Sequence, residues 1–110
     1  MRALRAWTAL LLVLAVVPRT AAAEGQEEPP DTVIQAALDA ASAQLAVPAD
    51  NLIVVMTAQR DWADASLGCP EPGRTYAQVI TPGYAVWIDT DDLLTEVQVN
   101  TDTDSRAAIC

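Results

Sequence analysis

Residues 31–62 read DTVIQAALDAASAQLAVPADNLIVVMTAQRDW, and the spacing of their apolar side chains changes near the middle. From Asp31 to about Ala46 the apolar residues recur at helical spacing, which is typical of an amphipathic helix. Asp31 is the expected N-cap. Pro48 ends the pattern, because the residue before a proline is disfavoured in the helical region. These features predict one helix whose apolar face needs a partner.

The second half of this stretch, residues 52–62, is rich in β-branched and apolar residues and predicts a strand. If the strand runs on to Trp62, one of its faces carries Leu52, Val54, Met56, Ala58 and Trp62. A loop is expected at 63–73, followed by a second strand at 74–80. We expect Thr81-Pro82-Gly83 to close that strand as a turn in which the glycine takes a positive φ.

Residues 84–89 and 93–101 predict a hairpin around Asp91 and Asp92. Its inward-facing residues are expected to be Tyr84, Val86, Ile88, Val97 and Val99. The order of elements therefore predicts an α+β fold, with one N-terminal helix packed on a curved antiparallel sheet of about four strands. Residues 31–110 are expected to form this single domain.

Residues 1–23 have the features of a signal peptide. These are a positive n-region at Arg2 and Arg5, an apolar run at 6–17 and small residues at 21–23. We place the cleavage after Ala23. An uncleaved anchor is the alternative, but Pro18 interrupts the run well short of the about 20 apolar residues that a membrane span needs. Because a signal peptide directs export, we expect a secreted or cell-envelope protein with no membrane attachment after cleavage. Residues 24–30 predict a flexible acidic leader.

The charge balance restricts the partners of the protein. The chain has 15 acidic and 6 basic residues, and histidine and lysine are absent. Residues 24–110 keep all 15 acidic residues but only three arginines, a net charge of −12. Such a field repels nucleic acids and anionic membranes, so neither is an expected partner.

The same composition restricts the chemistry. Without histidine or lysine, a histidine base, a Schiff-base lysine and a P-loop lysine are excluded. Ser66 has no such residue to activate it, so we expect no catalysis and no cofactor.

Cys69 and Cys110 predict one disulfide, since both lie in the exported part of the chain. The bond would close a loop of 42 residues, for which chain-entropy reasoning gives about 4 kcal/mol. Two free thiols are the alternative.

Glycine and proline are concentrated around Cys69, and this composition predicts a stiff loop. A rigid loop binds with little ordering cost, so we expect residues 64–73 to be presented to a partner protein. The expected binding residues are Asp64, Ser66, Leu67, Gly68, Pro70, Glu71, Pro72 and Gly73. Leu67 would then be an apolar residue at the loop tip. In the alternative interpretation the loop only stabilises a small domain, and Leu67 packs in the core.

The segment from Trp62 to Tyr84 resembles a group of small, uncharacterised bacterial exported domains. The shared pattern is W-x-D-x-S-L-G-C-P-x-P-G, then Y-x-Q, then T-P-G-Y, with a terminal cysteine. The order of elements also resembles PepSY and cystatin-like domains. This resemblance implies the same fold and an exported location.

Near the end, the group has Y-x-Y-H-T-D where this chain has Val97-Gln98-Val99-Asn100-Thr101-Asp102. The resemblance therefore implies a histidine at the position of Asn100. If that histidine serves function, this chain has lost it, whereas a structural role would change little.

Two weaker patterns suggest other interpretations. The aromatic residues Trp62, Tyr76, Tyr84 and Trp87 could form either a recognition surface or the bulk of the core. A calcium interpretation is invited by the acidic cluster Asp89, Asp91 and Asp92 and by the run Asn100, Asp102 and Asp104. Neither fits an EF-hand, so no metal ligands are assigned.

These observations lead to one working hypothesis and two alternatives. The first is a non-catalytic secreted binding or inhibitory module whose loop binds another protein, for example a protease. The alternatives are a PepSY-like accessory domain of the cell envelope and an acidic calcium-binding protein.

Overall fold

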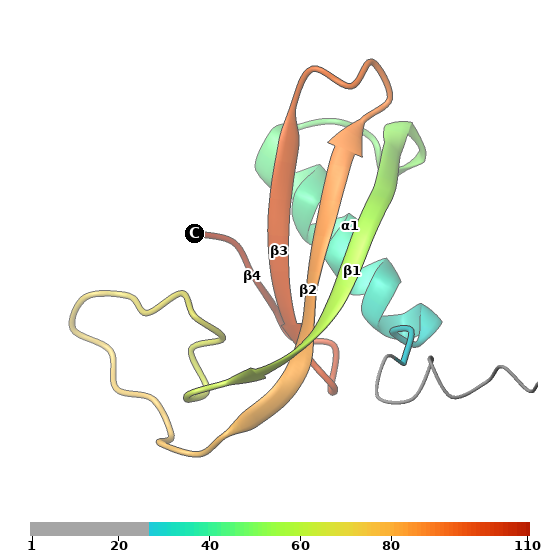
Figure 1. Ribbon diagram of the computed structural model, residues 1–110. Helices are drawn as coiled ribbons and strands as arrows, with labels where there is room; N and C mark the ends of the chain where they lie inside the picture. The colour runs from blue at the N-terminus through green and yellow to red at the C-terminus, as the bar shows by residue number, and fades with distance from the viewer. Residues whose placement is uncertain (1–26) are drawn as a thin grey trace, which may run out of the picture.

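The computed structural model describes residues 27–110 as one helix packed on an open four-stranded antiparallel sheet (Figure 1). The elements are α1 (Asp31–Leu45), the 3-10 turn η2 (Ala49–Asn51), β1 (Leu52–Trp62), β2 (Thr81–Thr90), β3 (Glu96–Asp102) and β4 (Ala107–Ala108). The strands lie in the order β1-β2-β3-β4. The α+β prediction is confirmed, and the predicted signal peptide lies outside the described residues.

Helix α1 begins without a side-chain cap. Pro30 is the N-cap, and its carbonyl accepts hydrogen bonds from the N–H groups of Val33 and Ile34 at 3.0 and 3.1 Å. Our assignment of Asp31 as N-cap was wrong, because Asp31 is already the first helical residue, where its charge suits the helix dipole. Within residues 27–110, no helix is long and apolar enough to cross a membrane.

The helix ends where the sequence predicts. Ala46 takes a left-handed conformation with φ 57°, and its N–H donates to the carbonyl of Ser42. The Ser42 hydroxyl donates to the carbonyl of Val47 at 2.6 Å, just before Pro48. These bonds satisfy groups that the last helical turn leaves free.

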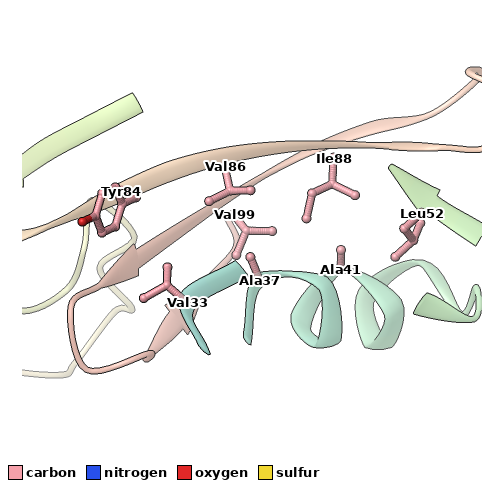
Figure 2. Packing of buried hydrophobic residues seen from close by; sticks show 8 residues of the cluster. All are labelled: Val33, Ala37, Ala41, Leu52, Tyr84, Val86, Ile88 and Val99. Atoms are coloured by element: carbon pink, nitrogen blue, oxygen red, sulfur yellow. The ribbon is translucent and has the colours of Figure 1, made fainter. Parts of the chain in front are cut away.

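The core lies between α1 and one face of the sheet (Figure 2). Figure 2 shows Val33, Ala37 and Ala41 on the helix pointing at the sheet residues. The buried cluster is completed by Leu52, Tyr84, Val86, Ile88 and Val99. The predicted inward faces of the hairpin strands are therefore confirmed, although Val97 is only partly buried.

The predicted face of β1 is wrong beyond Val54. The register with β2 shifts between Val54 and Met56, so Val55 is an extra residue in a β-bulge. A one-residue shift moves every following side chain to the other face. Met56, Ala58 and Trp62 therefore share the face opposite to the helix, and Met56 is exposed.

The predicted strand at 74–80 does not exist. This segment is part of a long loop, and only one residue in it, Tyr76, is even partly buried. The segment pairs with none of the four strands, and within it the carbonyl of Ala77 accepts a hydrogen bond of 3.0 Å from the N–H of Ala65 in the same loop. The fourth strand is instead β4, which the sequence did not indicate.

The predicted turn at 81–83 is also wrong, because these residues begin β2. Pro82 pairs with Asp61 beyond the end of β3, where β2 has only one neighbour and a missing N–H is tolerated. Gly83 has no positive φ. It is needed because a Cβ there would lie 1.8 Å from the carbonyl oxygen of Thr101 on β3.

The paired carboxylates Asp89 and Glu96 give the fold a pH dependence. They lie opposite each other on β2 and β3. The hydrogen bond with Asp89, burial and charge repulsion raise the pKa of Glu96. Folding therefore favours the protonated form of Glu96. Its contribution to the free energy of unfolding is fully present below the unfolded pKa near 4.5 and is lost as the pH rises through the folded pKa.

We expect Glu96→Gln to reduce the loss of stability between pH 4 and pH 7, because glutamine keeps a donor for Asp89 at both values. Thermal melts at the two pH values measure this difference. Glu28→Gln, on the exposed segment before α1, is the control and should behave as the native protein. An equal pH dependence in Glu96→Gln and in the control would contradict the prediction.

Candidate functional site

The loop of residues 63–80 connects β1 to β2 and gives this end of the protein its shape. The paired arms of β1 and β2 extend beyond the end of β3, and Figure 1 shows the loop, in yellow, leaving these arms on the side away from the helix. The first part of the loop, up to Cys69, is folded onto the sheet, whereas residues 70–75 are exposed. The two parts therefore have different roles.

Buried residues attach the first part of the loop to the sheet. Leu67 is 3% exposed, so it is not the apolar loop tip that we expected. The Asn100 amide on β3 donates to the carbonyl of Leu67 at 2.9 Å. The indole N–H of Trp62 donates to the carbonyl of Thr101 at 2.8 Å. Gly68 takes a positive φ of 80° close to the ring of Trp62, which fixes the backbone before the disulfide.

Asp64 and Ser66 form a local turn in the same part of the loop. The carboxylate of Asp64 accepts hydrogen bonds from the N–H and the hydroxyl of Ser66, at 2.9 and 2.5 Å. These bonds lower the pKa of Asp64, which makes it a poorer base. Ser66 is buried. This geometry suits a structural turn better than a nucleophile and its base.

The disulfide between Cys69 and Cys110 is present and joins the loop to the residues after β4. The two Cα atoms are 5.4 Å apart. Cys69 is buried next to Asn100, and Cys110 is exposed. The bond therefore holds together two segments that the sheet alone does not connect.

A groove of about 840 Å³ lies between these two segments. One wall is the loop from Ala65 to Ala77, and the other is the chain from Arg106 to Cys110, which includes β4. The disulfide connects the two walls. A volume of this size is within the range of pockets that enclose ligands, roughly 300–1,000 Å³.

Three side chains shape the loop wall of the groove. Arg74 forms a salt bridge of 3.1 Å with Glu71, and its guanidinium group lies 5.2 Å from the ring centre of Tyr76. The Tyr76 hydroxyl accepts a hydrogen bond from the N–H of Glu71 at 3.0 Å. The side chains of Arg74 and Glu71 are 62% and 64% exposed, so a ligand can reach them.

The opposite wall is held by the turn between β3 and β4. The buried carboxylate of Asp102 accepts hydrogen bonds from the N–H groups of Asp104 and Arg106, each at 2.9 Å. It also forms a salt bridge with Nε of Arg106. The Arg106 side chain is 59% exposed. This turn therefore fixes where β4 starts and presents an arginine at the groove.

The structure divides the expected binding residues into two groups. Asp64, Ser66, Leu67 and Gly68 shape the base of the loop, while Pro70, Glu71, Pro72 and Gly73 form its exposed part. The groove is also lined by residues that were not among the expected binding residues, namely Arg74, Tyr76, Arg106 and 107–109. Arg74 directly follows the predicted loop at 63–73 and could have been included, whereas nothing in the sequence places Arg106 at the groove.

Outside the groove, acidic side chains form hydrogen bonds that stabilise turns. Asp92 accepts hydrogen bonds from the hydroxyl of Thr90 at 2.6 Å and from the N–H of Leu94 at 3.0 Å. These bonds lower the pKa of Asp92 and stabilise the hairpin tip. Across residues 27–110, no three acidic, cysteine or histidine residues are grouped so that they could hold a metal ion.

The aromatic residues divide between the two faces of the sheet. Tyr84 lies in the core against α1, whereas Trp62, Tyr76 and Trp87 are half-buried outside it. Trp87 lies on the open face, where the Arg60 guanidinium group is 5.9 Å from its ring centre. The core interpretation is therefore correct only for Tyr84, and the recognition surface stays a prediction.

Fold and groove together define a small α+β domain in which a disulfide connects a β1–β2 loop to the final strand. The chain belongs to the family described as a domain of unknown function (DUF8738), whose model matches residues 34–110. The comparisons with curated proteins and with solved structures found no significant match. This membership identifies residues 34–110 as a domain of unknown function. The sequence motif and the likeness to PepSY and cystatin-like domains stay predictions.

Asn100, at the position where the resemblance implies a histidine, has a structural contact. It is 7% exposed, donates to Leu67 and accepts a 2.8 Å hydrogen bond from Gln98. We expect Asn100→Ala to lower the free energy of unfolding by about 2 kcal/mol, because a buried carbonyl loses its donor. Urea unfolding measures this loss. Gln35→Ala, which removes an exposed hydrogen bond to Asp39 on α1, should cost about 0.5 kcal/mol or less, and equal losses in the two variants would contradict this assignment.

Proposed function

We propose that the protein is a non-catalytic exported binding module, and that its groove between the loop and β4 binds a segment of a partner protein. The single observation that carries this proposal is that one disulfide connects both walls of an open groove. A groove held in this way loses little entropy when it binds.

The exposed part of the loop supports the same proposal. Pro70 and Pro72 restrict the backbone, and the Glu71–Arg74 salt bridge with Tyr76 forms a rigid polar surface. Tyrosine and arginine are frequent energetic centres of protein interfaces. The acidic charge of the chain favours a protein partner over nucleic acid.

Export is part of the proposal. The signal-peptide features of residues 1–23 support it, and a disulfide suits an oxidising compartment. The helix laid across an antiparallel sheet resembles cystatin-like inhibitors in the order of elements, so secreted proteases are the first partner class to test.

The test is capture of a partner from the culture supernatant of the source organism, followed by affinity measurement with matched variants. Glu71→Arg changes the charge of the exposed loop, and Asp39→Arg makes the same change on the exposed side of α1. We expect the first variant to change the affinity about tenfold and the second to leave it within about twofold. A partner that binds Glu71→Arg as tightly as the native protein would remove the loop from the binding site.

A parallel assay against a panel of secreted cysteine and serine proteases tests the inhibitory version. Inhibition by the native protein that is altered by Glu71→Arg and unchanged by Asp39→Arg would identify the partner class. Proteases that retain full activity would leave a non-inhibitory partner as the target of the groove.

A further inference from the structure

The outer edge of β4 presents backbone groups to the groove. β4 pairs with β3 on one side only, so its other side has no neighbouring strand among residues 27–110. The N–H of Asp102 donates to the carbonyl of Arg106 at 3.1 Å, which makes these two residues a hydrogen-bonded pair. In an antiparallel ladder such pairs alternate, so Ala108 bonds to Asn100, while Ala107 directs its N–H and C=O away from β3.

The outward groups of Ala107 are accessible from the groove. Ala107 is exposed, and Ala107, Ala108 and Ile109 all line the groove. Small side chains on this wall let another backbone approach closely. The wall therefore offers an outward N–H and C=O at Ala107, the pair of groups to which an added strand bonds.

The charge of the groove differs from the charge of the rest of the chain. The charged side chains that line it are Glu71, Arg74 and Arg106, and since Glu71 pairs with Arg74 and Asp102 pairs with Arg106, the groove is close to neutral. Residues 24–110 as a whole have 15 acidic residues and three arginines. Arg74 uses Nη1 for its salt bridge and Arg106 uses Nε, so each guanidinium keeps further N–H groups for a ligand. Carboxylates are the natural partners of such groups.

We infer that the groove binds an extended peptide segment of the partner, which adds to the outer edge of β4 as a further strand and places a carboxylate side chain against Arg74 and Arg106. This inference rests on the proposed function and names the chemistry of the bound segment. The backbone bonds supply binding that is independent of sequence, and the arginines select for an acidic residue.

The test uses a random 12-residue peptide library displayed on phage, panned on the disulfide-bonded protein expressed as the full chain. We expect enriched peptides to contain an aspartate or glutamate flanked by residues that favour extended structure. A synthetic copy of the best peptide is then measured by fluorescence anisotropy. Replacing its acidic residue with the matching amide should weaken binding about tenfold.

Variants at position 107 test the strand addition. Ala107→Pro removes the N–H that points into the groove and leaves the ladder with β3 intact, so the melting temperature should change little while peptide affinity falls about tenfold. Ala107→Ser keeps the N–H and should bind as the native protein. If Ala107→Pro lowers the melting temperature substantially, a second measurement replaces this variant. It is the change in the amide chemical shifts of Ala107 and Ile109 when the native protein binds the peptide.

Arg74→Gln tests the choice of ligand charge at an exposed residue that contributes little to stability. The variant should weaken binding of the acidic peptide and leave binding of its amide version unchanged. The inference is overturned if panning enriches no peptide, if it enriches basic ones, or if Ala107→Pro and Ala107→Ser bind equally well. A partner that still depends on Glu71 in the capture experiment would then preserve the proposed function without this binding mode.

Discussion

Replacing Gly83 with alanine is expected to lower the free energy of unfolding by about 4 kcal/mol or more, which is at the upper end for a single substitution. A Cβ at this position would lie 1.8 Å from the carbonyl oxygen of Thr101 and 2.8 Å from Cα of Asp102. Both are backbone atoms of β3, so no side chain can move to relieve the overlap. β2 and β3 would have to separate at the end of the sheet from which the loop extends.

Urea unfolding followed by tryptophan fluorescence measures this effect. Gly73→Ala is the control, because Gly73 has a positive φ of 81° but no neighbouring atom within 4 Å of the place that a Cβ would take. Strain alone should cost about 1 kcal/mol there. Equal losses for Gly83→Ala and Gly73→Ala would show that β3 does not approach Gly83 closely in solution.

Removal of the disulfide is expected to have the next largest effect. The double variant Cys69→Ser and Cys110→Ser opens a loop with a sequence separation of 41, for which chain entropy gives about 4 kcal/mol. This is a large fraction of the roughly 5–15 kcal/mol that stabilises a folded domain. We expect the variant to unfold at much lower urea concentration and to lose binding at the groove.

Two measurements separate these effects. Unfolding in urea reports the stability, and partner binding at a temperature where the variant stays folded reports the groove. The native protein treated with a thiol reductant should match the double variant in both. A folded double variant that binds its partner normally would show that the bond does not hold the groove.

Periodicity was sufficient to predict much of the fold. The apolar spacing of 31–46 predicted α1, and alternation in Tyr84, Val86 and Ile88 predicted the strand that crosses the core. It failed at Val55, because a bulge adds a residue without any glycine or proline to mark it. It failed again at 74–80, where alternation in the sequence has no neighbouring strand to pair with.

The candidate site was predictable only where the chain itself marks it. The cysteine pair and the glycine and proline residues around Cys69 indicated the loop and its anchor. The opposite wall is β4, a strand of two alanines that carries no periodic signal. Its place beside the loop depends on tertiary pairing with Asn100 and Thr101, so Arg106 could not be assigned to the groove from the sequence alone.

The most direct test of the proposed groove is an amide chemical-shift map of the disulfide-bonded protein with its captured partner. We predict the largest changes at residues 70–77 and 106–110, which form the two walls of the groove. Changes confined to α1 or to the hairpin tip at 91–95, with both walls unaffected, would contradict it.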